Sequence, residues 1–111
     1  MICIFCEIAA GRATADVVLR NEWVTAFHDI HPTAPTHILV IPNTHIPSLD
    51  ELTDPDLAAQ LLLACRQVAQ AAGLSERGYR VLTNVGRGGG QHIFHLHFHV
   101  IGGRRLAWPP G

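Results

Sequence analysis

The sequence predicts an α+β fold: an antiparallel sheet of about five strands, one long helix packed across it, and a short N-terminal helix. Two observations lead to this fold class. Residues 54–72 carry apolar side chains at helical spacing. Around them lie short segments rich in β-branched and aromatic residues, separated by loops rich in Gly and Pro. A length of 111 residues suits one domain, residues 1–111.

The first part of the chain is predicted to hold the short helix and three strands. Residues 3–10 form the helix, and Gly11 ends it. Residues 17–29 form two strands around a turn at Asn21 and Glu22, because Val, Trp, Thr and Phe favour a pleated surface. After a Pro-containing loop, the apolar residues 36–42 form a buried strand.

The long helix is predicted over residues 54–72. Thr53 suits its N-cap, and Gly73 suits its C-terminal end. The residues expected on its buried face are Leu57, Leu61, Ala64, Cys65, Val68 and Ala72. Because Cys65 belongs to this apolar face, we interpret it as a packing residue and not as a nucleophile.

The C-terminal part is predicted to add two strands, residues 79–85 and 94–102, joined by the Gly-rich loop 86–91. Alternate side chains of a strand point to opposite faces, so the last strand has a histidine face and an apolar face. The histidines are His95, His97 and His99, and the apolar residues are Leu96, Phe98 and Val100. We expect the apolar face to cover the helix and the histidines to lie on the outer face.

Composition excludes several classes of protein. Hydrophobic residues make up 48%, charged residues 15%, and the formal net charge is -1, which is typical of a globular domain and not of a nucleic-acid binder. No apolar run reaches the ~18–20 residues of a membrane span. The N-terminal segment has no basic region and Glu7 interrupts its apolar stretch, so we predict no signal peptide. We therefore expect a cytoplasmic protein with three reduced cysteines and no membrane partner.

Eight histidines are the unusual feature, because imidazole binds metals and attacks phosphorus. Three readings of the histidine row are open. Solvated strand positions explain the alternation but not the repeated choice of histidine. A shared zinc ion is disfavoured, because His95 and His99 lie ~13 Å apart on a regular strand and a zinc bond is only ~2 Å long. Phosphate chemistry needs a nucleophile, N–H donors and a proton donor, which a row of imidazoles beside a Gly-rich loop supplies.

The segment QHIFHLHFHVIGG, residues 91–103, resembles the His-φ-His-φ-His-φ-φ signature of the histidine triad (HIT) superfamily of nucleotide hydrolases and transferases. Residues 27–46 resemble the first half of that family, and residues 83–91 resemble its phosphate loop. The tail, residues 102–111, resembles that of the HINT branch. These segments cover about half the chain in the expected order.

The resemblance implies roles for five histidines. His97 would attack the α-phosphorus of a nucleotide, and His99 would hydrogen-bond the α-phosphate. His95 and His37 would orient the nucleophile through backbone and side-chain hydrogen bonds. His92 stands where HINT relatives usually have a serine that is thought to help the leaving group. Since imidazole also donates a proton near neutral pH, we expect activity to persist with a changed leaving-group preference.

The same resemblance implies a pocket for a purine nucleotide. The base would lie against Ile4, Phe5, Ile8, His28 and Ile30, the ribose hydroxyls would bind Asp29, and the phosphate side would be lined by Asn84, Gly90, Gln91 and His92. Other readings stay open for several positions. Asp29 suits a turn cap before Pro32, Ile8 and Ile30 suit an ordinary core, and His28 and His31 suit the surface, which we favour for His31.

Cys3 and Cys6 form a Cys-x-x-Cys motif, which alone indicates redox chemistry, metal binding or packing. Some bacterial HIT proteins that begin with this motif bind structural zinc. The resemblance places the ligands at Cys3, Cys6, His45 and His95. A Cys2His2 set is closed, so this zinc would be structural and not catalytic. No organic cofactor is expected.

The function implied by the resemblance is that of a HINT-like hydrolase that cleaves the P–N bond of nucleoside 5′-phosphoramidates through a nucleotidyl-histidine intermediate. Three alternatives stay open: a dinucleoside polyphosphate hydrolase, a nucleotidyl transferase, and a purine-nucleotide-binding regulatory module with incidental hydrolysis. A hydrolase that uses zinc directly on the triad is disfavoured by the spacing. The family also implies a homodimer, in which the apolar tail, with Trp108, reaches the partner's site.

Overall fold

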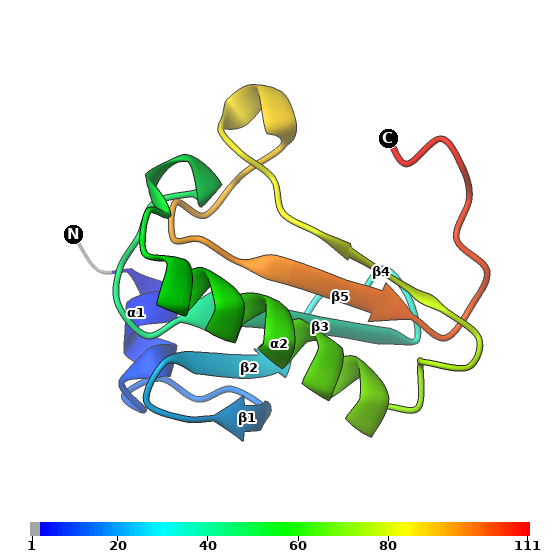
Figure 1. Cartoon of the computed structure of the whole chain (residues 1–111), viewed down its shortest axis with the longest axis horizontal. Coiled ribbons are helices and arrows are strands. Elements are labelled where there is room, and N and C mark those ends of the chain that lie inside the picture. The colour runs from blue at the N-terminus through cyan, green and yellow to red at the C-terminus, as the bar shows by residue number, and fades with distance from the viewer. Residues whose placement is uncertain (1–2) are drawn as a thin grey trace.

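Five antiparallel strands form one sheet in the order β1-β2-β3-β5-β4 (Figure 1). The strands are Val17–Arg20 (β1), Val24–His28 (β2), Thr36–Pro42 (β3), Tyr79–Leu82 (β4) and Phe98–Gly102 (β5). This computed structural model describes residues 3–111, so the first two residues of the predicted domain lie outside the described range. The predicted α+β class, with a five-stranded sheet and two helices of unequal length, is confirmed.

The long helix α2 (Pro55–Ala71) crosses one face of the sheet (Figure 1). Its N-cap is Asp54 and not the predicted Thr53, because the Asp54 carboxylate accepts hydrogen bonds from the N–H groups of Asp56 and Leu57. The buried residues of the helix are Leu57, Leu61, Ala64, Cys65, Val68 and Ala69. The prediction of a buried Ala72 is wrong, because the helix ends before this residue and Ala72 is its exposed C-cap.

The short helix α1 (Ile4–Ala9) packs against β2 and β3. It begins after Cys3, whose Sγ accepts a hydrogen bond from the Cys6 N–H, and it ends before Gly11, which has a φ of +76°. A second apolar cluster joins the helix to the sheet: Phe5, Ile8, Phe27, Leu39 and Ile41. The predicted short helix is therefore confirmed, with bounds one residue shorter at each end.

Alternation along β3 decides which histidines share a face. Ile38 and Val40 pack in the cluster with α2, whereas Leu39 and Ile41 pack in the cluster with α1. Alternation on β3 therefore places His37 on the α1 side of the sheet. Since Leu39 pairs with His99 on β5, His99 lies on this side as well.

The last strand starts at Phe98 and not at the predicted residue 94, and β4 ends at Leu82 and not at residue 85. The early part of the predicted strand leaves the sheet because it bonds elsewhere. The Leu96 N–H donates to the Ile46 carbonyl at 2.6 Å, in the connection between β3 and α2. The alternation nevertheless holds, because Leu96, Phe98 and Val100 all lie in the cluster with α2.

The reading of the histidines as solvated positions is wrong. His95 is 0% exposed and His97 is 8% exposed, although both lie away from α2.

Two short 3-10 helices, Leu49–Glu51 (η1) and Arg87–Gly89 (η2), lie in the connections between β3 and α2 and between β4 and β5. Within residues 3–111, no helix has the length and apolar content needed to cross a membrane.

Candidate functional site

A cleft of about 620 Å³ lies between α1, the loop after β2 and the loop before β5. Its lining includes nearly all residues predicted for nucleotide binding: Ile4, Phe5, Ile8, His28, Asp29, Ile30, Asn84, Gly90, His92, His97 and His99. The reading of Ile30 as core is wrong, because its side chain is 85% exposed at the cleft. Thr14, Ala15, Phe27, Leu39 and Ile93 also line the cleft, and no motif in the sequence identified them. His31, which we expected on the surface only, is exposed and lines the rim.

His97 is held in one orientation inside this cleft. Its ring Nδ1 lies 2.8 Å from the backbone oxygen of His95. A carbonyl oxygen only accepts hydrogen bonds, so Nδ1 carries the proton and Nε2 keeps its lone pair. The His97 carbonyl accepts a hydrogen bond from Thr83 Oγ1 at 2.7 Å, and the Phe5 ring packs edge-on against the imidazole. His97 therefore combines a fixed backbone, a fixed ring and an unprotonated nitrogen.

His37 and His99 form a chain of hydrogen bonds with a defined proton order. The Thr33 backbone N–H donates to His37 Nδ1 at 3.1 Å, so the His37 proton is on Nε2. His37 Nε2 lies 2.9 Å from His99 Nδ1 and donates to it. The His99 proton is then on Nε2, a buried atom that has no hydrogen-bond partner among the described residues. The His37 ring thus orients His99 directly, whereas the resemblance implied that His37 orients the nucleophile.

Burial keeps this pair of rings uncharged. Desolvation, assisted by His97 and His37, lowers the pKa of His99 to about 4, and the carboxylate of Asp29 opposes the shift only in part. Desolvation likewise lowers the pKa of His37, again against the opposing charge of Asp29. Near neutral pH the cleft therefore contains a neutral, partnerless N–H donor on His99, which fits an anionic oxygen.

Gln91 is the one residue predicted for nucleotide binding that does not line the cleft. Its side chain is 3% exposed, and all of its hydrogen bonds go to backbone groups. Oε1 accepts from the Gly86 N–H at 2.9 Å, and Nε2 donates to the carbonyls of Pro47 and Ile93 at 2.8 and 3.0 Å. Gln91 therefore holds the Gly-rich loop against the connection after β3. The adjacent Gly90, with a φ of +85°, lines the cleft in its place.

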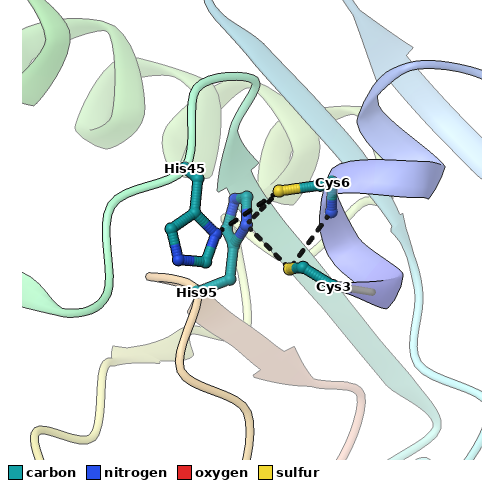
Figure 2. A group of neighbouring side chains, drawn as sticks. All are labelled: Cys3, Cys6, His45 and His95. Atoms are coloured by element: carbon teal, nitrogen blue, oxygen red, sulfur yellow. Dashed lines mark hydrogen bonds between the residues drawn. The ribbon is translucent and has the colours of Figure 1, made fainter. Parts of the chain in front are cut away.

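Cys3, Cys6, His45 and His95 form a compact cluster beside the cleft (Figure 2). The two cysteines come from the start of α1, and the two histidines come from the loops after β3 and before β5. His95 Nδ1 lies 3.3 Å from Cys3 Sγ and 3.5 Å from Cys6 Sγ, and His45 Nδ1 lies 3.3 Å from Cys6 Sγ. The sequence therefore identified a real convergence of four metal-ligating side chains.

The cluster fits a tetrahedral metal ion. With Zn–S and Zn–N bonds of ~2.3 and ~2.0 Å, tetrahedral ligand atoms lie roughly 3.5 Å apart, close to the separations found here. His95 Nε2 donates to the Pro42 carbonyl at 2.9 Å, which leaves the Nδ1 lone pair facing the two sulfur atoms. Such a second hydrogen bond is typical of metal-bound histidine. Burial raises the pKa of the Cys6 thiol, so binding of a metal there would release a proton.

A second group, Asp29, His37 and His99, also brings three potential metal ligands together. It does not suit a metal, because His37 Nδ1 accepts the Thr33 N–H and its Nε2 therefore holds a proton. Among the described residues, no such group contains all three histidines of the triad. Cys65 lies on the buried face of α2, and desolvation raises the pKa of its thiol to about 12, which agrees with a packing role.

The chain is similar to proteins of known family. The family model for the HIT domain matches residues 10–106. A HIT family hydrolase from Legionella pneumophila is 47% identical, with a TM-score of 0.96 over 99% of this chain and 100% of that one. A histidine triad nucleotide-binding protein from Candida albicans is 31% identical, with a TM-score of 0.85 over 97% and 83%. An uncharacterized HIT-like protein from Synechococcus elongatus is 46% identical over 97% of this chain and 96% of its own length.

Proposed function

This chain belongs to the HIT family, and from that premise we propose that it is a nucleotide hydrolase that cleaves the P–N bond of nucleoside 5′-phosphoramidates. The names of its relatives, a HIT family hydrolase and a histidine triad nucleotide-binding protein, support hydrolysis and a nucleotide. One observation carries the reaction: the Nδ1–H of His97 donates to the His95 carbonyl, so Nε2 keeps its lone pair in the cleft. The Trp-Pro-Pro tail, which resembles that of the HINT branch, favours phosphoramidates over polyphosphates.

In the first step, His97 Nε2 attacks the α-phosphorus. A new N–P bond forms, and the bond from phosphorus to the amine breaks with its electron pair leaving on the amine. The positive charge that develops on the His97 ring is stabilised by the Nδ1–H bond to the His95 carbonyl. His99 Nε2–H donates to a phosphate oxygen as negative charge develops there.

The leaving amine needs a proton, and His92 lines the cleft where it can supply one. Protonated His92 donates to the amine, which leaves as the neutral product. In the second step, water attacks the phosphorus of the nucleotidyl-His97 intermediate, and neutral His92 accepts the water proton. The P–N bond to His97 breaks, its electron pair returns to Nε2, and a nucleoside monophosphate leaves.

The nucleoside is proposed to lie at the apolar end of the cleft. Ile4, Phe5 and Ile8 on α1 offer an apolar wall for a purine base, and the exposed Ile30 adds to the apolar lining. Asp29 is proposed to bind the ribose hydroxyls. Its Oδ1 accepts the His31 N–H at 2.9 Å, so it also caps a turn, while Oδ2 faces His37 Nε2 at 3.4 Å and keeps acceptor capacity for a ligand. The prediction that Asp29 caps a turn is therefore confirmed, and the proposed ribose contact is compatible with it.

Zinc is the metal we propose for Cys3, Cys6, His45 and His95. When bound, it would supply cross-linking and no Lewis-acid chemistry at the phosphate, because protein ligands fill all four positions. His95 then serves the metal through its ring and the nucleophile through its carbonyl. No organic cofactor is needed for the proposed steps.

We also propose a homodimer with two-fold symmetry in which residues 1–111 act as one HIT domain. Trp108 is 81% exposed, and the preceding backbone is held by Arg80, which donates to the Ala107 carbonyl at 2.8 Å. An apolar side chain presented in this way suits a partner's surface near the substrate. Light scattering of the wild type and of Trp108→Ala tests whether the protein is a dimer. A comparison of their KM values tests whether the tail lies near the substrate.

The experiment that tests the proposed function compares the wild type with His97→Ala on adenosine 5′-monophosphoramidate. Release of adenosine monophosphate by the wild type, lost in a folded His97→Ala variant, supports the proposal. Turnover of dinucleoside polyphosphates alone would favour the alternative hydrolase or transferase. Tight nucleotide binding without turnover of either class would favour a binding module.

A further inference from the structure

Asp29 lies beside the pair of histidines that ends in the partnerless donor. Its Oδ2 is 3.4 Å from His37 Nε2, the same nitrogen that donates to His99 Nδ1. Its Oδ1 accepts the His31 N–H, so the loop itself fixes the orientation of the carboxylate. Asp29 therefore lines the cleft and at the same time contacts the histidine pair that holds the proposed phosphate donor.

The proton order of the histidine pair depends on what faces each nitrogen. A carboxylate only accepts hydrogen bonds, so Asp29 favours the form of His37 with its proton on Nε2. The Thr33 N–H, on the other side of the ring, favours the same form. With this order the buried Nε2 of His99, a residue that lines the cleft, carries an N–H that can donate to a ligand. The reversed order would leave a lone pair there, which repels an anionic phosphate.

We propose that Asp29 is a positioning residue that couples ribose recognition to phosphate binding. Its carboxylate holds the proton of His37 on Nε2, so that His99 keeps its N–H directed to the substrate. A carboxylate has about four acceptor positions, of which His31 takes one and His37 faces another, so ribose hydroxyls can bind at the same time. The inference rests on the proposed function for the identity of the ligand.

The test separates the two roles of Asp29 by removing the ribose hydroxyls from the substrate. The wild type and Asp29→Asn are compared on adenosine 5′-phosphoramidate and on its 2′,3′-dideoxy analogue. The amide oxygen of the introduced asparagine can still accept the His31 N–H, which preserves the turn. Its NH2 group, however, would oppose the His37 Nε2–H with a second donor. Asp16→Asn makes the same change of charge at an exposed side chain and is the control.

We expect Asp29→Asn to lower kcat on the dideoxy substrate roughly tenfold or more, while Asp16→Asn leaves it unchanged. A change within about twofold would overturn the inference, because Asp29 would then act on the ribose alone. The second readout is the 15N NMR signal of each imidazole nitrogen in the protein without substrate. His37 and His99 should both be protonated on Nε2 in the wild type, and Asp29→Asn should change the protonated fraction at these nitrogens.

The NMR measurement does not depend on catalysis, so it tests the role of Asp29 even if the proposed function is wrong. If the wild type hydrolyses neither substrate, the proposed function fails, and the tautomers of His37 and His99 still decide the role of Asp29. Unchanged tautomers in Asp29→Asn would overturn it. Thermal unfolding and the His31 amide signal show whether Asp29→Asn keeps its fold, and the isosteric change makes that the expected result.

Discussion

The carbonyl oxygen of His95 accepts a hydrogen bond from His97 Nδ1, with 2.8 Å between the oxygen and the nitrogen. The ring of the same His95 faces the thiols of Cys3 and Cys6. One buried residue thus contacts both the proposed nucleophile and the proposed metal site. The Phe5 ring on α1 packs edge-on against the imidazoles of both histidines and provides a second connection. Damage to the cluster of Cys3, Cys6, His45 and His95 should therefore affect the proposed nucleophile, even though the proposed metal would take no part in the chemistry.

Removal of one metal-binding thiol should cost both the metal and rigidity around His97. We expect wild-type protein grown with zinc to contain one zinc ion per chain, and Cys3→Ser and Cys6→Ser to contain much less. Their unfolding temperatures should fall, because metal binding contributes to folding free energy. Elemental analysis and calorimetry measure the two effects. Cys65→Ala is the control: its cavity lowers stability, but its zinc content should equal that of the wild type.

Stability should fall as the pH is lowered from about 6.5 to about 4, partly because of His99. Its pKa is about 4 in the folded chain, against an ordinary value of 6.5, so the unfolded chain binds the extra proton in this range. Stability therefore rises with pH across this window and is fully restored above it. Urea unfolding of metal-free protein at pH 7 and pH 5 measures the difference, which should shrink in His99→Gln. An equal difference in both proteins would show that other groups account for it.

Loss of Gln91 should loosen the Gly-rich loop. Its buried amide satisfies three backbone groups, so Gln91→Ala should lower the free energy of unfolding by about 2–3 kcal/mol. The KM for the phosphoramidate should rise as well, because Asn84 and Gly90 in this region line the cleft. Gln70→Ala, at an exposed position of α2, is the matched control and should change neither quantity. A Gln91→Ala variant as stable as that control would show that Gln91 does not hold the Gly-rich loop in place.

His92 should matter most for substrates with a poor leaving group. Since a strongly basic amine cannot leave without a proton, His92→Ala should slow alkyl phosphoramidates by about 10²-fold and aryl phosphoramidates much less. His92→Ser, which restores the residue usual in HINT relatives, shows whether a hydroxyl can replace the imidazole. Rates measured across a series of amines of graded pKa provide the comparison. An identical loss for every leaving group would remove His92 from proton transfer.

Local sequence patterns predicted the strands, the helices and the faces of their side chains. Hydrogen bonds between residues far apart in the chain could not be predicted in this way. Alternation correctly placed Leu96, Phe98 and Val100 against α2, and the family resemblance correctly brought the Cys-x-x-Cys motif together with two distant histidines. The start of β5 was wrong because Leu96 bonds to Ile46, a partner that no strand propensity encodes. Gln91 was misplaced for the same reason, since its acceptor Pro47 is far away in the sequence and becomes a neighbour only after folding. Pro42 and Thr33 set the tautomers of His95 and His37 through backbone groups, so their side chains gave no sign of this role.

The central claim is that His97 Nε2 forms a bond to phosphorus, and trapping that bond tests it most directly. Wild-type protein is mixed with adenosine 5′-phosphoramidate, quenched within one turnover at alkaline pH, digested and analysed by mass spectrometry. We predict an adenylyl group on His97, absent from His97→Ala and present in Asp16→Asn. Turnover at full rate with no adduct, or with the adduct on another residue, would contradict the account.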